Sequence, residues 1–132
     1  MGTRFLASRE ALISKGFQEA VLKAKDGGVS TGRTTLYDHL RGTHGWPKLF
    51  DARGVLNQSF WDHEKGMSEE ENTKLYQKAM ELGDASWGEQ GRMTTYAGTG
   101  VGLILKTMPA GEIVSEVLRD SKVCLKRAQG KL

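Results

Sequence analysis

Apolar positions recur along the chain mainly with the period of an α-helix, between short stretches that favour strands. Residues 1–7 are apolar and favour a strand. Ser8 is a candidate N-cap of a first helix, which Gly27-Gly28 ends. Residues 29–37 again favour a strand. The expected apolar stripe of the first helix consists of Ala11, Leu12, Phe17, Ala20, Val21 and Ala24.

Two further helices are predicted in the second half of the chain. Ser68 and Glu71 have the spacing of a capping box, and they predict a helix that Gly83 ends. Pro109 is expected to open a last helix. The expected buried stripes are Leu75, Ala79 and Leu82 in the former and Ile113, Val114, Val117 and Leu118 in the latter. The pattern therefore predicts a mainly α-helical chain with short strands.

The middle of the chain, residues 38–66, lacks a clear period and is rich in aromatic residues. Segments of this kind usually wrap over a core and anchor themselves by burying their rings. We expect this for Trp46, Phe50, Phe60 and Trp61. With no internal repeat, residues 1–132 are predicted to form one partial domain, with a basic tail at residues 119–132.

Length and charge restrict the class of protein. A chain of 132 residues is too short for a complete (β/α)8 barrel, which needs roughly 250. Its 38% of hydrophobic and 27% of charged residues suit a packed core. The net charge of +3 gathers in the basic tail, which we interpret as a solvated helix face, so no nucleic-acid partner is expected. No apolar run approaches the roughly 18 residues of a membrane span, so no membrane partner is expected.

The cysteine content bears on the compartment. A single cysteine, Cys124, can form neither an internal disulfide nor a thiolate metal cage. A reduced thiol favours an intracellular, cytoplasmic setting. A peroxisomal or mitochondrial location stays open, because the ending Gly130-Lys131-Leu132 loosely resembles a peroxisomal address.

The candidate catalytic and metal-binding residues form no known pattern. His39, His44 and His63 match no metal-ligand spacing, so we expect surface or hydrogen-bonding histidines and no metal. The glutamates at 69–71 fan around a helical turn rather than pairing as acid and base. The predicted place of Cys124, late in the last helix, disfavours a thiolate. The residues alone therefore predict no catalytic group.

Two glycine elements remain as candidates for anion binding. Gly98-x-Gly100-x-Gly102 departs from the dinucleotide-binding pattern, and close helix packing is the alternative explanation. Gly2-Thr3 is more suggestive, because glycine lets backbone N–H groups approach an anion and threonine adds a donor. A following helix would add its positive end. A strand–turn–helix connection, however, requires small residues in any case.

Three stretches of the chain follow one another in a recognisable order. They are Met1-Gly2-Thr3-Arg4-Phe5-Leu6-Ala7-Ser8, then Trp46-Pro47 with Asp51-x-Arg53 and Asn57, then Ala97-Gly98-Thr99-Gly100-Val101-Gly102-Leu103 through Pro109-Ala110-Gly111-Glu112-Ile113-Val114. Taken together, these stretches resemble the C-terminal portion of the nitronate monooxygenase family, formerly called 2-nitropropane dioxygenases. The opening stretch is also shared with flavin-dependent enoyl reductases.

The resemblance implies an α/β fold, with this chain as the C-terminal segment of a TIM barrel that binds FMN. Met1, Gly2 and Thr3 would hold the FMN phosphate, in line with the preference of such barrels for phosphate after strands 7 and 8. The substrate would be an alkyl nitronate, which oxygen converts to a carbonyl compound and nitrite.

The part of the family that this chain resembles does not include the family's catalytic histidine. That residue lies in a Gly-Gly-His-x-Gly setting upstream of the matching region, and none of the three histidines here has this setting. We therefore expect a fragment that is inactive alone, with exposed apolar patches around Leu12 and Ile113. It would self-associate or need a missing upstream chain. The alternatives are an enoyl reductase-like fragment and a non-catalytic helical interaction module.

Overall fold

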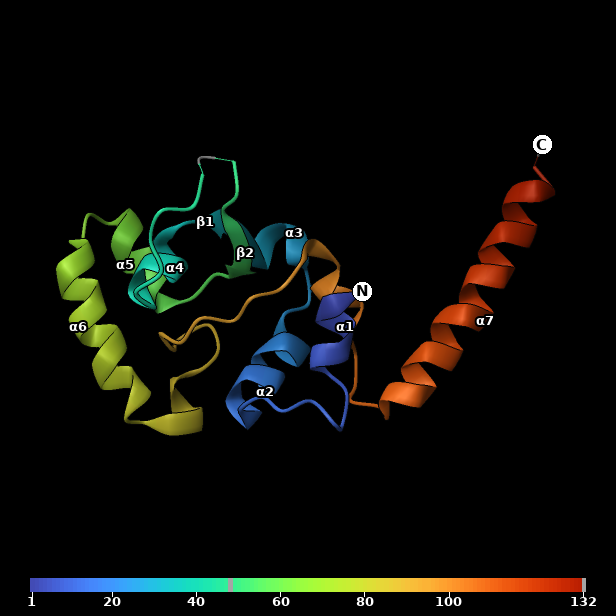
Figure 1. Ribbon diagram of the computed structural model, residues 1–132, viewed down its shortest axis with the longest axis horizontal. Coiled ribbons are helices and arrows are strands. Elements are labelled where there is room, and N and C mark those ends of the chain that lie inside the picture. Colours follow the sequence, from blue (N-terminus) through green and yellow to red (C-terminus); the bar gives the residue numbers. More distant parts are fainter. Residues whose placement is uncertain (48, 132) are drawn as a thin grey trace.

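The structure, a computed structural model, describes residues 1–47 and 49–131. Within these residues, helices dominate and one short sheet lies near the middle of the molecule (Figure 1). The α-helices are α1 (Gly2–Leu6), α2 (Lys15–Lys23), α3 (Gly27–Ser30), α4 (Leu36–Leu40), α5 (Gln58–Glu64), α6 (Glu69–Met80) and α7 (Ala110–Gln129). The 3-10 helices are η1 (Gly83–Ser86) and η2 (Thr99–Leu103). The predicted mixture of helices with short strands is confirmed.

The strand predicted at residues 1–7 is wrong, because this segment forms helix α1. The carbonyl of Met1 accepts a hydrogen bond of 2.9 Å from the N–H of Arg4. A helix satisfies its backbone groups locally, whereas a strand needs a neighbouring strand to do so. The helix predicted from Ser8 begins later, with Ser14 as its N-cap. Ser8 instead pairs with Met108 in an isolated parallel bridge.

The sheet consists of two antiparallel strands, β1 (Thr31–Thr34) and β2 (Ala52–Val55). Their register pairs Thr31 with Val55, and β1 falls within the strand predicted at residues 29–37. Strand β2 and helix α5 correct the expectation that residues 38–66 are irregular throughout. This part of the chain therefore contributes one strand and one helix to the fold.

The expected burial of the central aromatic rings is largely wrong. Trp46 and Phe50 are 55% and 64% exposed, Trp61 is 42% exposed, and only Phe60 packs against a core cluster. The described residues between α4 and β2 extend away from the body of the molecule (Figure 1). Gly42, which follows the C-cap of α4, has a φ of 78°, a value that favours glycine.

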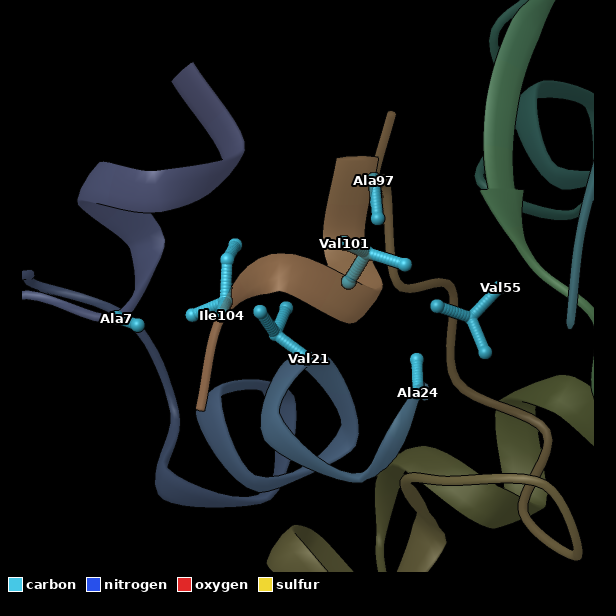
Figure 2. Close-up of a cluster of buried hydrophobic side chains, with 7 residues drawn as sticks. All are labelled: Ala7, Val21, Ala24, Val55, Ala97, Val101 and Ile104. Carbon is cyan, nitrogen blue, oxygen red and sulfur yellow. The ribbon is translucent and has the colours of Figure 1, made fainter. Parts of the chain in front are cut away.

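Two small clusters make up the core. Figure 2 shows the first, in which α2, β2 and the segment around η2 meet beneath the end of α1. The second packs α4 against α6. The first cluster consists of Ala7, Val21, Ala24, Val55, Ala97, Val101 and Ile104, and the second of Leu36, Tyr37, Leu40 and Tyr76.

The capping prediction for α6 is confirmed, since the Ser68 hydroxyl accepts from the Glu71 N–H at 3.2 Å. Its buried stripe differs from the predicted one. Asn72, Tyr76 and Ala79 are buried, whereas Leu82 is 68% exposed. The helix already ends at Met80, so Leu82 lies beyond its last turn.

The last helix follows Pro109 as predicted, but only its N-terminal part, as far as the half-buried Val117, packs against the rest of the described chain. Ile113 is fully buried, whereas Val114 and Leu118 are exposed. The expected stripe is therefore wrong for these two positions, because α7 projects from the rest of the molecule (Figure 1). The exposure expected at Leu12 is confirmed. The basic tail continues α7 in the described residues, and Leu132 lies outside them.

None of the described helices has both the length and the apolar character that a membrane crossing requires.

Candidate functional site: the Thr3–Gly98 hollow

The structure brings the two glycine elements of the sequence together. The side-chain oxygen Oγ1 of Thr3 accepts a hydrogen bond of 3.0 Å from the backbone N–H of Gly98. The hydroxyl proton of Thr3 therefore remains available for a ligand. A hollow of about 320 Å³ opens at this contact, and we call it the Thr3–Gly98 hollow. Its lining residues are Thr3, Leu6, Arg53, Tyr96, Ala97 and Gly98.

Helix α1 positions the first wall of the hollow. Its Arg4 guanidinium donates to the Lys106 carbonyl at 3.2 Å and lies 3.6 Å from the Glu116 carboxylate on α7. A Cβ atom at Gly2 would have no other atom within 4 Å, so open space lies beside this backbone. The expectation of a strand end followed by a separate helix is corrected, because the helix begins at Gly2 itself.

The second wall includes Gly98, the N-cap of η2, and the other two spaced glycines, Gly100 and Gly102, lie within η2. A Cβ at Gly102 would lie 2.0 Å from the Lys25 carbonyl oxygen, so close packing requires this glycine. Gly100, by contrast, has open space at its Cβ position. Of the three, Gly98 lines the hollow. The packing interpretation is therefore confirmed for Gly102.

Arg53 and Tyr96 set the charge of the hollow. Nη1 of Arg53 donates a hydrogen bond of 3.0 Å to the Thr31 carbonyl, which holds the guanidinium in place. The guanidinium has further N–H donors besides this one. Tyr96 donates its hydroxyl proton to Asp38. Burial, reinforced by the Asp38 carboxylate, raises the pKa of Tyr96 to about 12, so this phenol is neutral near pH 7. Arg53 was not among the predicted site residues, although it stands in the Asp51-x-Arg53 motif.

The three histidines lie elsewhere. Nδ1 of His39, on α4, is 3.0 Å from Oε2 of Glu69 at the start of α6. The His44 ring lies beside that of His39, with 4.8 Å between the ring centroids. The expectation of a hydrogen-bonding histidine is confirmed at His39. The spacing of His39, His44 and Glu69 along the chain did not predict that the fold brings them together. His63, on α5, does not belong to this group, and Cys124 is exposed on α7.

The donor set of the Thr3–Gly98 hollow suits an anion. The Thr3 hydroxyl and the Arg53 guanidinium are groups of the kind that commonly contact phosphate oxygens. The described lining contains no carboxylate that would repel an anion. The site therefore provides binding groups and lacks, among its described lining residues, a histidine or carboxylate that could act as a base.

Comparison with known proteins identifies relatives of the chain. No protein-family model matches it. It is 47% identical over 125 residues to "Nitronate monooxygenase npaC" of Metarhizium robertsii, covering 95% of the chain and 35% of that protein. It is 36% identical over 129 residues to "Nitronate monooxygenase" of Neurospora crassa, covering 98% of the chain and 33% of that protein.

The chain thus spans about a third of the length of the curated relatives it matches, which is consistent with the C-terminal portion that the resemblance implied. Over nearly all of its residues, the chain is homologous to nitronate monooxygenases.

Proposed function

We propose that the chain forms part of an FMN-dependent nitronate monooxygenase, an oxidoreductase that converts alkyl nitronates and oxygen to a carbonyl compound and nitrite. In that enzyme the chain would supply the C-terminal segment of a TIM barrel. The contact between Thr3 and Gly98 supports this most directly, because it joins the first and the third of the three stretches that carry the family resemblance. The names of both relatives support the same activity.

The residues of the Thr3–Gly98 hollow fit the phosphate end of FMN. The Thr3 hydroxyl has a proton to donate, Gly2 leaves open space beside its backbone, and Arg53 adds positive charge. Met1 lies next to them and is 73% exposed. We assign phosphate binding to Met1, Gly2 and Thr3, with Arg53 as an added electrostatic contact. FMN, when bound, supplies the redox chemistry of the reaction.

The chain's own residues would bind and orient the cofactor without carrying out proton transfer. None of its three histidines lines the Thr3–Gly98 hollow. Loss of a general base typically lowers a rate by roughly 10²- to 10⁴-fold. We therefore propose that the chain is inactive alone and that its partner is the portion of such an enzyme that it does not match.

The exposed face of α7 supports the need for such a partner. Val114, Leu118 and Leu125 are 46%, 58% and 64% exposed. Their spacing places them on one side of the helix. In the complete enzyme we expect the remaining barrel to cover them, and in the chain alone we expect a second copy to do so.

Complementation tests the proposal. The chain is produced alone and together with the portion of the Metarhizium robertsii relative that it does not match, and both preparations are assayed with an alkyl nitronate. We expect flavin and nitrite production from the pair and neither from the chain alone. A pair without flavin would contradict the proposal. A pair that needs a nicotinamide cofactor would instead indicate an enoyl reductase.

A further inference from the structure

A second cavity, of about 690 Å³, shares no lining residue with the Thr3–Gly98 hollow. His39, His44 and Glu69 all line it. We propose that these three residues bind a divalent transition-metal ion of the zinc type at this cavity. The proposal is independent of the flavin function, because neither its residues nor its test involves the hollow.

The three side chains offer suitable ligand atoms in a small space. One nitrogen from each histidine and one carboxylate oxygen all lie within 4.8 Å of one another. Zinc binds such atoms at about 2.0–2.2 Å, which places tetrahedral ligands about 3.4 Å apart. The contact between His39 and Glu69, at 3.0 Å, is slightly shorter than this separation, so these two groups need only a small outward adjustment. Only His44 has to move closer.

The local backbone permits this movement of His44. The residue is exposed and lies between Gly42 and Gly45, whose φ angles are 78° and 85°. Neither glycine has another atom within 4 Å of its Cβ position. His39 and Glu69, by contrast, belong to helices α4 and α6, which pack against each other. The site thus has two ligands on packed helices and one on an adaptable loop.

An ion pair alone does not account for this arrangement. The contact between His39 and Glu69 would satisfy the charge and hydrogen-bonding groups of both side chains. It does not explain why the His44 ring lies against the His39 ring. Arg41 also lines the cavity, and its positive charge would oppose a metal ion. Its guanidinium, however, is held over the Tyr96 ring, 5.4 Å from the ring centroid.

The chemistry of the ligand set favours zinc over magnesium or calcium. Imidazole nitrogens suit zinc, nickel, copper and cobalt, whereas magnesium and calcium prefer oxygen ligands. Three protein ligands are also the number found in zinc sites that keep a fourth position for water or substrate. Here the cavity provides space for that position, beside Tyr76, Trp87 and Met93.

Cobalt titration tests the site in the full 132-residue chain, produced without a histidine tag. Co²⁺ alone is added, and its visible absorption reports coordination; Zn²⁺ is then added as a competitor. The variants are H44Q and E69Q. Their matched controls are H63Q, which removes the histidine outside the cluster, and E70Q, which alters the neighbouring glutamate on the same helical turn.

We expect one Co²⁺ per chain, with an intense tetrahedral spectrum that Zn²⁺ abolishes. H44Q and E69Q should each weaken binding at least 10-fold, the smallest loss typical of altered metal surroundings. H63Q and E70Q should leave it unchanged. Circular dichroism checks that each variant is folded. If H44Q does not fold, the binding measured for E69Q decides whether the cluster binds the metal. Equal losses in the controls, or an unchanged spectrum in 6 M guanidinium chloride, would overturn the proposal.

Discussion

The hydroxyl of Thr3 and the backbone N–H of Gly98 are joined by a hydrogen bond of 3.0 Å, although 95 positions separate them in the chain. Neighbouring contacts reinforce the link. The N–H of Arg9 donates to Met108, and the Glu10 carboxylate accepts from the N–H of Ala110, capping α7 in place of a local side chain. The first ten residues therefore bind the segment that leads into the last helix and complete the candidate phosphate site.

Replacement of Gly102 by alanine should destabilise the fold. Its Cβ would collide with the Lys25 carbonyl oxygen, a backbone atom that cannot rotate away. We expect a loss of about 1–3 kcal/mol in the free energy of unfolding, as for other overpacked sites. G100A is the matched control, because its Cβ would enter open space. Urea unfolding measures both variants, and equal stability of the two would contradict the packing role.

The ion pair between Asp62 and Arg92 should make stability depend on acid pH. Burial raises the pKa of Asp62, but hydrogen bonds from Arg92 and Gln58 and the charges of Arg92 and Lys65 outweigh it, so the net pKa is lowered. The stabilisation is therefore complete above the unfolded pKa of about 3.9 and is lost as pH falls through the lower folded value.

D62N should consequently be less stable than the original chain near pH 7, by about 1 kcal/mol, the upper end of the range for ion pairs that keep some contact with solvent. The difference should shrink as the pH is lowered from 5 to 2. Thermal unfolding followed by circular dichroism measures it, with E64Q on the same helix as a control. A difference that does not change with pH would show that Asp62 acts through packing alone.

The sequence predicted features whose determinants are local. The Ser68 cap of α6 and the start of α7 after Pro109 both depend on a few neighbouring residues. The strand predicted at residues 1–7 failed because a short apolar run does not by itself distinguish a helix from a strand. Burial of Val114 and Leu118 failed because helical periodicity identifies an apolar face without showing whether another element covers it.

The candidate site was predictable only in part. Gly2 and Thr3 were identified from their chemistry and from the family resemblance, and they line or border the hollow. Arg53 reaches it through the register of β2, and His44 meets His39 and Glu69 through the packing of α4 on α6. Contacts of this kind depend on tertiary structure, which residue spacing along a single chain does not specify.

The exposed face of α7 should make the isolated chain self-associate. L118E places a charge within this apolar face and should shift the chain toward the 14.5 kDa monomer in gel filtration. R127E is the control, because it introduces the same acid nine residues later, on the opposite side of the helix. If the original chain is already monomeric, or if both variants elute identically, the face does not drive association.

The binding of FMN and riboflavin to the complemented pair provides the most direct test of the proposed phosphate site, because riboflavin lacks the phosphate. T3V removes the hydroxyl and T3S retains it. We predict that T3V weakens FMN binding about 10-fold, equivalent to about 1.4 kcal/mol, and leaves riboflavin binding unchanged, while T3S resembles the original chain. An equal effect of T3V on both flavins, or no effect on either, would contradict phosphate binding by Thr3.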